Sequence, residues 1–461
     1  MLFNNIYDMT NQEMKYKAYL IHNFKTIPQM KKLSDEEINE IEVVGNVLPF
    51  KVNNYVIDEL IDWDNYKTDP IFRLTFPQKE MLVEEDFERM RKALKDNLAR
   101  EELKEVANEI RMKLNPHPAG QMEMNVPELD GEQMPGIQHK YEQTLLFFPG
   151  SGQTCHSYCT FCFRWAQFVG MDGLKFAMRE TDGLVKYLEQ HQEVTDLLFT
   201  GGDPMIMNFK VFQQYIEPFL DPNNQTNIQT IRIGTKSLGF WPYKFISDKG
   251  AQDFLDLFKR ITDSGINLTF MAHFNHINEL KTDAVKEATK LLLDVGVQIR
   301  TQSPLIKNIN DDADMWAKMW REQVNMGMIP YYMFVERDTG ASHYFEMPLE
   351  KTWEIFQAAY QQVSGICRTV RGPSMSCTPG KVQVLGTQEI PINGEMEKVF
   401  VLQMLQGRNP DWVARPFFAK YDPNASWMDD LEPVFGDKFF FDDELGEMME
   451  EAGLEPELEL A

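Results

Sequence analysis

Residues 144–162 read TLLFFPGSGQTCHSYCTFC, a strand-like run that leads directly into a cysteine-rich loop. The run TLLFF consists of apolar and β-branched side chains, which is typical of a short buried strand. A loop with Gly and Ser follows, and three cysteines come shortly after it. We therefore expect chemistry at the carboxyl end of this strand, where parallel α/β sheets carry their sites.

Five similar apolar runs follow, and most of them start about 30 to 36 residues after the previous run. Their first residues are Asp196, Ile231, Asn267, Gly296 and Ile329. The interval is the length of a strand, a crossover helix and the next strand. The pattern predicts an α/β fold with about six parallel strands arranged as a partial (β/α)6 barrel. An open doubly wound sheet is the structural alternative.

The regions on either side of this core differ from it in composition. The predicted regions are a mainly helical part (1–138), the core (139–347), an α+β extension (348–427) and an acidic tail (428–461). In the first region, Ser34 followed by Glu37 resembles a capping box, and a Pro- and Gly-rich stretch at 115–136 predicts the boundary. The tail is most simply a solvated extension, and a lid or a partner-docking arm is the alternative.

The composition of the 461 residues excludes several classes of protein. A formal net charge of −25 repels phosphate backbones and anionic membranes, so we expect no nucleic-acid or membrane partner. No apolar run approaches the roughly 18 residues of a membrane span, and no basic stretch precedes an apolar block at the N-terminus. We therefore expect a cytoplasmic protein. Its five cysteines are too few and too unevenly placed to form a disulfide framework.

Cys155, Cys159 and Cys162 form the motif CxxxCxxC. Three thiolates at this spacing can bind three irons of a [4Fe-4S] cluster and leave the fourth iron open to a ligand. Two plainer explanations exist. The cysteines could be small buried apolar residues on one helical face, or they could hold zinc together with His156. The zinc alternative is poor because His156 directly follows Cys155 and would point elsewhere.

This motif, placed after the first strand, resembles the radical S-adenosylmethionine superfamily, whose open iron binds the amino and carboxylate groups of S-adenosylmethionine. The resemblance implies cleavage of this cofactor to methionine and a 5′-deoxyadenosyl radical, which takes hydrogen from an unactivated carbon. A second segment, GGDP, ends the second strand-like run. The resemblance implies that Gly201, Gly202 and Asp203 position S-adenosylmethionine, whereas a tight turn is the plainer explanation.

Further segments are similar to lysine 2,3-aminomutases and follow the order of that family. They are DPIF (69–72), HKY (139–141), IRIGTKS (231–237), HFNHINE (273–279), TQSPLIKNIND (301–311), PYYMF (330–334) and PGK (379–381). The resemblance implies that Lys381 holds pyridoxal phosphate, a task that suits a lysine whose amine is neutral. The other implied roles are the cofactor phosphate for Lys140 and Tyr141, the substrate carboxylate for Arg164, and the adenosyl pocket for His273 and Gln302.

The chain departs from that family around the pyridoxal phosphate. The loop before Lys381 reads GPSMSCTPG, so only Gly380 remains next to the lysine where the family has a run of glycines. A second arginine on the phosphate side is replaced by Thr144. The cysteines that bind zinc near the C-terminus of some members are absent, so we predict no zinc site.

The residues for the substrate side chain also differ. The family's two aspartates, which bind the ammonium group of lysine, fall at Arg337, with Asp338 next to it, and at Arg371. Guanidinium groups at these positions would repel lysine and would suit a distal carboxylate. The alternative is that either arginine pairs with a local carboxylate such as Glu336 or Glu346.

The sequence thus predicts a radical S-adenosylmethionine enzyme with a [4Fe-4S] cluster and pyridoxal phosphate, acting as a 2,3-aminomutase on an amino acid other than lysine. The resemblance implies an electron donor such as flavodoxin or ferredoxin, and a homo-oligomer is compatible with the sequence. One alternative is a radical enzyme without pyridoxal phosphate that takes hydrogen from a peptide or metabolite. Another is a non-catalytic iron–sulfur or zinc scaffold.

Overall fold

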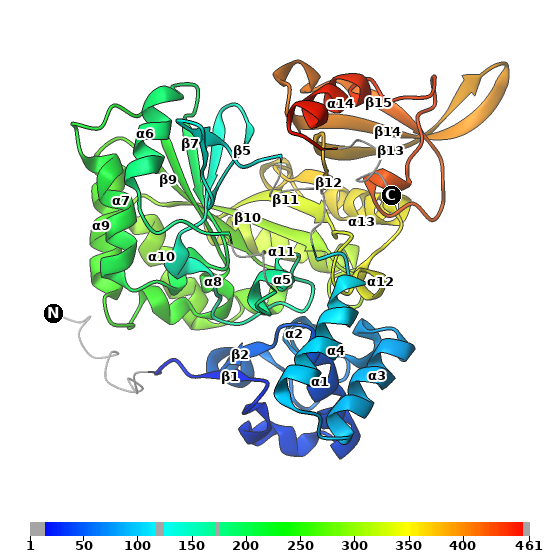
Figure 1. Cartoon of the computed structure of the whole chain (residues 1–461). Coiled ribbons are helices and arrows are strands. Elements are labelled where there is room, and N and C mark those ends of the chain that lie inside the picture. The colour runs from blue at the N-terminus through cyan, green and yellow to red at the C-terminus, as the bar shows by residue number, and fades with distance from the viewer. Residues whose placement is uncertain (1–13, 117–123, 172–175, 455–461) are drawn as a thin grey trace.

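The computed structural model describes residues 14–116, 124–171 and 176–454. Helices of the N-terminal region lie at one end of a large sheet, and strands of the C-terminal region extend the sheet on one side (Figure 1). The N-terminal elements are β1 (Ala18–Leu20), α1 (Asp35–Val47), β2 (Lys51–Asn53), α2 (Pro70–Thr75), α3 (Glu84–Lys95) and α4 (Arg100–Met112).

Local signals explain where these helices begin and end. The predicted capping box of α1 is confirmed, because the Glu37 amide donates to Ser34 Oγ and the Ser34 amide donates to Glu37 Oε2. The acidic first turn of α1 also suits the positive end of the helix dipole. Residues 83–114 have continuous helical spacing but form two helices, since Asn97 between them adopts a left-handed backbone with φ 51°.

An 11-stranded sheet forms the centre of the molecule. Its strands are β5 (Ile137–Tyr141), β6 (Thr144–Phe147), β7 (Asp196–Phe199), β8 (Thr230–Thr235), β9 (Asn267–His273), β10 (Gln298–Leu305), β11 (Ile329–Val335), β12 (Arg371–Ser376), β13 (Gly380–Ile392), β14 (Glu395–Gly407) and β15 (Pro416–Lys420). Strands β6 to β12 pair in parallel and in chain order, whereas β5 and β13 to β15 pair antiparallel. The predicted α/β class is confirmed, and β6 to β11 are the six predicted strands.

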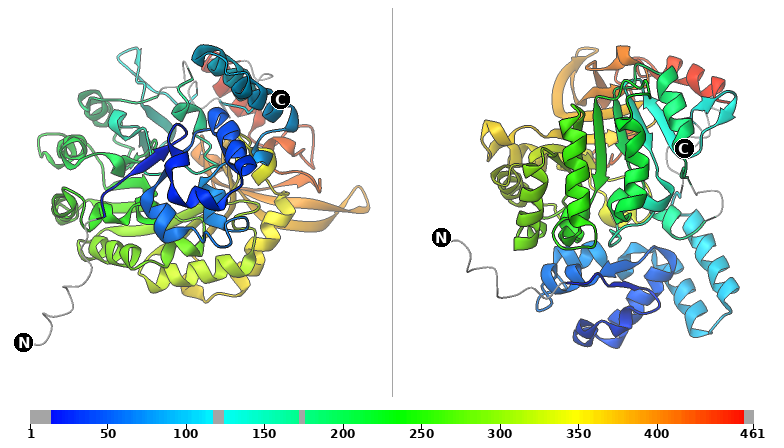
Figure 2. Two further views of the ribbon diagram at one scale, coloured as in Figure 1. Left: turned by 90° about the horizontal axis from the view of Figure 1, so that it is seen from below. Right: turned by 90° about the vertical axis from the view of Figure 1, so that its left-hand side faces the viewer.

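Helices cover one face of the parallel strands, as the two views of Figure 2 show. They are α6 (Asp182–Gln190), α7 (Phe209–Leu220), α9 (Ala251–Asp263), α10 (Asp283–Asp294), α11 (Ala313–Asn325) and α13 (Leu349–Gln361). The one-turn helices α5 (Trp165–Phe168), α8 (Ser237–Phe240) and α12 (Ser342–Phe345) lie in the loops after β6, β8 and β11. Phe199 of β7 and Ile231 of β8 pack with Phe212 of α7 and Phe258 of α9 in one fully buried cluster. This apolar layer fixes which strand residues face the helices.

The opposite face of the same strands carries polar side chains. In β8, Ile231 and Ile233 are buried against the helices, and Arg232 between them is half-buried on the other side. Strand β7 repeats the pattern, with Leu197 in the apolar cluster and Asp196 outside it. Successive side chains of a strand point to opposite faces, so the inner face of the sheet gathers charges that come from several strands.

The N-terminal region closes the carboxyl ends of the parallel strands. Phe50 and Phe76 of this region share one buried cluster with Phe161 and Trp165, which follow β6, and with Ile306, which follows β10. The helical region is therefore packed onto the loops that carry the predicted site. No helix within the described residues is long and apolar enough to cross a membrane.

The C-terminal region builds a further apolar cluster on β13 and β14. Helix α14 (Asp442–Glu451) places Leu445 and Met449 in this cluster together with Phe441. The acidic tail is therefore not only a solvated extension, because its apolar residues recur at helical spacing and are buried. Residues 455–461 of the tail lie outside the described residues.

A short hairpin of β3 (Glu128–Leu129) and β4 (Glu132–Gln133) lies between the N-terminal helices and the central sheet in the sequence.

Candidate active site

The loop with the three cysteines leaves the carboxyl end of β6. Cys155, Cys159 and Cys162 are free thiols, and each is half-buried. Burial raises the pKa of all three thiols, that of Cys162 to about 11. The pKa of Cys155 is raised first by burial and then by the charges of Asp203, Cys162 and Cys159. The structure thus brings the predicted cysteines together, in a place where a cationic cluster would offset their mutual repulsion.

The arrangement of the thiols bears on which metal group they could hold. Within the described part of the chain, no three His, Cys, Asp or Glu side chains are placed to hold one metal ion. A zinc ion needs its ligands within one coordination sphere, whereas a [4Fe-4S] cluster binds each cysteine through a different iron. Three cysteines on one loop could therefore each serve a different iron of such a cluster.

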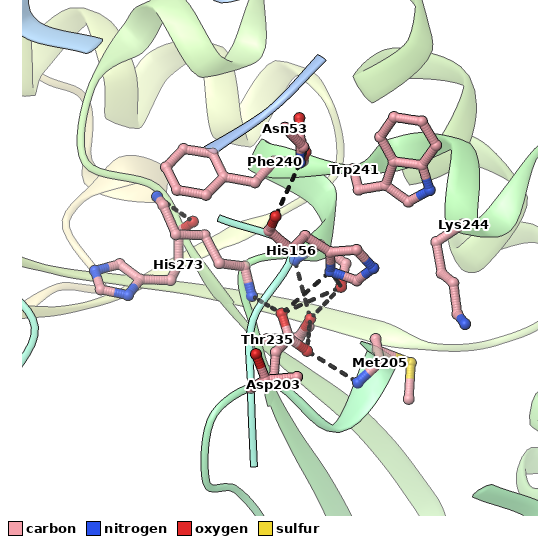
Figure 3. Close-up of polar contacts among 12 residues, drawn as sticks. Asn53, His156, Asp203, Met205, Thr235, Phe240, Trp241, Lys244 and His273 are labelled. Carbon is pink, nitrogen blue, oxygen red and sulfur yellow. Dashed lines mark hydrogen bonds and ion pairs between the residues drawn. The ribbon is translucent and has the colours of Figure 1, made fainter. Parts of the chain in front are cut away.

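The N-terminal region holds the backbone of this loop. The Tyr158 amide donates to the Lys51 carbonyl at 2.8 Å, and the Thr160 amide donates to the Leu74 carbonyl at 2.9 Å. Asn53 adds a buried side-chain link, because its amide nitrogen Nδ2 donates to the carbonyls of His156 and Phe240 (Figure 3). These contacts attach the cysteine loop to β2 and α2 of the N-terminal region, which lie far away in the sequence.

Gly201 and Gly202, after β7, pack against the same loop. Gly201 has φ 132°, and a Cβ atom there would lie 2.3 Å from Gln153 Nε2. A Cβ atom at Gly202 would lie 2.4 Å from the amide nitrogen of Thr154, the residue before Cys155. Only glycine fits at both positions, so the backbone of the GGDP loop supports the cysteine loop directly.

Asp203 is buried, and its carboxylate is saturated with hydrogen bonds from its own neighbourhood. Oδ1 accepts from Thr235 Oγ1 at 2.7 Å and from the Met205 amide at 2.9 Å. Oδ2 accepts from the Lys236 amide at 2.9 Å and from Ser237 Oγ at 3.2 Å (Figure 3). Burial raises the pKa of Asp203, and these hydrogen bonds oppose the shift. Asp203 therefore braces the loop that carries the two glycines.

His273 and Gln302, both predicted for the adenosyl pocket, are direct partners across β9 and β10. The Phe161 ring lies 5.7 Å from the His273 ring, centre to centre, so the pair borders the cysteine loop. His273 Nε2 is buried and has no hydrogen-bond partner among the described residues. Burial, and then the charge of Lys236, lowers the pKa of His273 well below its ordinary value. A buried nitrogen of this kind fits a site that a polar ligand completes.

Two arginines lie beside the cysteines. The Arg164 amide hydrogen-bonds Cys162, and the charges of Arg337 and Cys155 act on the Arg164 side chain. Both guanidinium groups approach the Phe163 ring, at 5.4 Å for Arg164 and 5.6 Å for Arg337. Burial lowers the pKa of Arg164 to about 10. Among the described residues no carboxylate is within ion-pair distance of Arg164, whereas Asp338 and Asp429 act on Arg337.

Arg371 lies elsewhere, although it was expected to act together with Arg337. Its backbone pairs with Tyr332 of β11, and Arg337 comes five residues later along that strand direction. At about 3.3 Å per residue, the end of β11 at Val335 is roughly 10 Å beyond that pair, and Arg337 follows the end of the strand. The Arg371 guanidinium stacks 4.4 Å from the centre of the Tyr331 ring and 4.6 Å from that of Tyr332. The structure therefore groups Arg337 with Arg164 and places Arg371 with the predicted cofactor lysine.

Lys381, the predicted cofactor lysine, begins β13 and reaches across the inner face of β11. Its Nζ lies 4.2 Å from the centre of the Tyr332 ring and 5.4 Å from that of Phe334. Burial, and then the charges of Arg232 and Arg371, lowers the pKa of Lys381 to about 7. Much of the side chain is then neutral at physiological pH, which is the form that can attack an aldehyde. These surroundings fit a lysine that binds an aldehyde cofactor.

The other residues expected at the cofactor phosphate have partners within the protein. Lys140 Nζ donates to the Cys377 carbonyl, and burial lowers its pKa well below the ordinary value. The Tyr141 side chain is hydrogen-bonded to Ser376, and burial raises the pKa of Tyr141. Thr144, where the family has an arginine, donates through Oγ1 to Asp196 Oδ2 at 3.2 Å. Lys140 and Lys381 are near enough for their charges to interact.

Sequence reasoning missed the side chains that surround Lys381 and those that hold the cysteine loop. Arg232 and Arg300 lie on the inner face of the sheet, and the only signal for them is a charge within an otherwise apolar run. Asn53 lies about a hundred residues before the cysteines that it supports, and nothing in its local pattern marks it. A buried ion pair between Lys236 and Glu279, 2.6 Å long, was missed in the same way.

No protein-family model matches the chain, but curated proteins do. A protein of Aquifex aeolicus that is named, provisionally, as an L-lysine 2,3-aminomutase is 28% identical over 402 residues, which cover 87% of this chain and 92% of that protein. A second Aquifex aeolicus protein with the same provisional name is 26% identical over 80% of this chain and 87% of its own length. The L-lysine 2,3-aminomutase of Bacillus subtilis is 23% identical over 75% of this chain and 63% of its own length.

Among solved structures, the radical S-adenosylmethionine methyltransferase TsrM from Kitasatospora setae is 12% identical, with a TM-score of 0.30 over 42% of this chain and 36% of that one. The structure of anSMEcpe with bound AdoMet is 13% identical, with a TM-score of 0.33 over 47% of this chain and 57% of that one. Likenesses this low carry no argument. The sequence similarities are informative, and they make the chain a divergent relative of the L-lysine 2,3-aminomutases, as its motifs predict.

Proposed function

We propose that the chain is a radical S-adenosylmethionine enzyme that exchanges an amino group and a hydrogen atom between adjacent carbons of an amino acid other than lysine, with an acidic amino acid as the favoured substrate. In this proposal β6 to β11 act as a partial (β/α)6 barrel with the reacting groups on its inner face. The exchange is redox-neutral overall, and a donor such as flavodoxin or ferredoxin supplies the electron that starts it.

The observation that carries the proposal is the direct contact between the cysteine loop and the GGDP loop. The Asp203 amide donates to the carbonyls of Gly152 at 3.0 Å and Thr154 at 2.8 Å, and Gly202 packs on Thr154. Three free thiols therefore lie on a loop that packs closely on the glycines of the GGDP loop, at the carboxyl ends of parallel strands. This supports a metal cluster with a small-molecule ligand at its side.

When bound, the [4Fe-4S] cluster with S-adenosylmethionine would supply a carbon radical, and pyridoxal phosphate would supply a π system through which nitrogen can migrate. In this proposal Cys155, Cys159 and Cys162 hold three irons, and His273 and Gln302 line the nucleoside pocket. Lys381 presents a neutral amine from the amino ends of the parallel strands, opposite the end with the cysteines. The N-terminal region covers the carboxyl ends of the strands and keeps water away from the site.

The charges beside the cysteines favour an acidic substrate. Arg164 lacks a carboxylate partner among the described residues and can bind the α-carboxylate, a task that suits a guanidinium group. The charge of Arg337 acts on Arg164, so in this proposal Arg337 is the group that would meet the distal end of the substrate. A distal ammonium would be repelled there, and a distal carboxylate would be attracted. Asp338, Glu336 and Asp429 also act on Arg337 and weaken this preference.

The test is anaerobic reconstitution with iron, sulfide, S-adenosylmethionine and pyridoxal phosphate, followed by incubation with a reductant and single amino acids. We expect 5′-deoxyadenosine, and conversion of glutamate or aspartate to a β-amino isomer, with lysine unchanged. Cys159→Ala should abolish formation of 5′-deoxyadenosine. The matched control Cys367→Ala removes a buried thiol outside the loop and should retain it. Cleavage that survives Cys159→Ala would refute the cluster, and conversion of lysine would refute the acidic substrate.

A further inference from the structure

A cavity of about 540 Å³ lies at the amino ends of the parallel strands, opposite the end with the cysteines. Its lining comes from the first residues of β7 to β12, from β13 and from β14. The charged residues in the lining are Asp196, Arg232, Arg300, Arg371 and Lys381. The cavity therefore has three guanidinium groups, one lysine amine and one carboxylate, in a molecule whose net charge is −25.

Two tyrosines of β11 contact the guanidinium groups of Arg300 and Arg371 and the amine of Lys381. The Tyr331 ring centre lies 5.1 Å from the Arg300 guanidinium and 4.4 Å from that of Arg371. The Tyr332 ring centre lies 4.6 Å from the Arg371 guanidinium and 4.2 Å from Lys381 Nζ. Cations over aromatic faces keep their N–H groups available for an anion. The three cations thus converge on one place, although they come from β10, β12 and β13.

The single carboxylate of the cavity is already engaged. Asp196 forms an ion pair of 2.6 Å with Arg232 and accepts a hydrogen bond from Thr144. Among the described residues, no carboxylate forms an ion pair with Arg300, Arg371 or Lys381. Like charges in a partly buried cavity repel each other, so the empty arrangement costs free energy that a bound dianion would recover. Phosphate matches this demand because guanidinium groups bind it with two parallel hydrogen bonds.

The positions that the family resemblance assigns to the phosphate are less suited to it here. Lys140 Nζ donates to the Cys377 carbonyl, and Thr144 offers a hydroxyl that is bonded to Asp196. Lys381, by contrast, reaches into the cavity, and the charges that act on it are those of Arg232 and Arg371. Arg232 is already paired with Asp196, so an aldehyde cofactor attached to Lys381 would have Arg371 as its first unpaired cation, with Arg300 next to it across the Tyr331 ring.

We propose that this cavity is the phosphate site of the lysine-bound cofactor, with Arg371 and Arg300 as its principal phosphate ligands in place of Lys140 and Thr144. The inference rests on the proposed function, and it also gives Arg371 a role other than binding the substrate side chain. The ligand class is a phosphorylated aldehyde whose phosphate carries close to two negative charges.

The experiment compares pyridoxal phosphate with pyridoxal, which lacks only the phosphate. Both are titrated into the cofactor-free full-length protein, and the absorption band of the lysine-bound form is followed. For Arg371→Gln we expect an affinity for pyridoxal phosphate at least tenfold weaker, with the affinity for pyridoxal changed less than twofold. Arg300→Gln should act in the same direction. The control Arg415→Gln removes an arginine that stacks on Phe440 outside the cavity and should change neither affinity.

The other outcomes separate this inference from the proposed function. A wild-type protein with no band that depends on Lys381 overturns both. A band that depends on Lys381 but is equally strong in Arg371→Gln, in Arg300→Gln and in wild type overturns the phosphate site alone. So does a larger loss of pyridoxal phosphate affinity in Lys140→Gln than in Arg371→Gln. If Arg371→Gln does not fold, as judged by its circular dichroism, Arg300→Gln decides the question.

Discussion

The two ends of the same parallel strands are built in different ways. At the carboxyl ends, backbone groups of the cysteine loop, the GGDP loop and the N-terminal region bond directly to one another. At the amino ends, the cavity around Lys381 is made of side chains, most of them positively charged. The first end is closely packed and fixed before any ligand arrives, whereas the second keeps an excess of charge that a ligand would balance.

The difference shows which parts of a site tolerate change. A loop held by backbone contacts at glycine positions depends on residue type and spacing, so it keeps a recognisable motif. A cavity lined by side chains from several strands can exchange one arginine for another on a different strand and keep its charge. Thr144 and Arg371 are interpreted here as one such exchange. The contrast requires that substitutions at the packed end be costly and that the charged end adapt to them.

The largest effect is expected for Gly202→Ala at the packed end. Its Cβ would lie 2.4 Å from the Thr154 amide nitrogen, and backbone on both sides leaves no room for the methyl group. We expect a loss of about 1–3 kcal/mol in the free energy of unfolding, or more, and loss of S-adenosylmethionine binding. Thermal unfolding and equilibrium dialysis would measure the two. Gly446→Ala, where no atom lies within 4 Å, is the control, and equal stability of the two variants would contradict the account.

Asn53→Ala should have the next largest effect. The substitution removes hydrogen bonds to the His156 and Phe240 carbonyls and to the Val56 amide, all in a buried setting. Leaving these groups unsatisfied should cost about 1–3 kcal/mol in unfolding free energy and lower the iron retained after reconstitution. The neighbouring Asn54→Ala, which breaks exposed hydrogen bonds with the backbone of Lys15 and Lys17, should retain the iron. Full iron content in both variants would show that the N-terminal region does not hold the loop.

At the charged end, the pKa of about 7 for Lys381 predicts a specific pH dependence. The folded protein favours the neutral amine, so a lysine that is protonated in the unfolded chain up to pH near 10.5 loses its proton in the native state above pH 7. Between pH 10.5 and 7 the unfolded chain takes up a proton at Lys381 and the folded chain does not. The free energy of unfolding therefore decreases as pH falls through this range. The rate of cofactor attachment should rise about tenfold per pH unit below pH 7 and level off above it. Stopped-flow absorbance would measure it, and a rise that continues to pH 10 would contradict the assignment.

The smallest effect is expected for Lys51→Gln, back at the packed end. Lys51 Nζ donates to Thr154 Oγ1 at 3.3 Å, and its charge acts on Cys155. A positive charge stabilises the reduced, more negative state of a cluster, so its removal should lower the reduction potential by less than about 59 mV, a factor of ten for one electron. Electrochemical titration followed by electron paramagnetic resonance would measure it. A potential that rises instead would contradict this placement of Lys51.

The sequence was sufficient for some of these features and not for others. Spacing alone located β6 to β11, because apolar strands and crossover helices alternate at a regular interval. The sequence also placed the cysteine loop and Gly201–Asp203 directly after the first two of these strands, where the structure has them. The partners of Arg337 and Arg371 were not, since they depend on the register of β11 and β12, and that register follows from long-range packing. The same holds for Asn53, whose contacts cross about a hundred residues.

The central claim is that the three cysteines hold a [4Fe-4S] cluster with one iron open to S-adenosylmethionine. Electron paramagnetic resonance of the reduced, anaerobically reconstituted protein, with and without S-adenosylmethionine, tests it most directly. We predict a signal from a reduced [4Fe-4S] cluster that changes shape when S-adenosylmethionine is added and that is absent in Cys159→Ala. A protein that contains zinc without sulfide, or a cluster signal that S-adenosylmethionine leaves unchanged, would contradict the account.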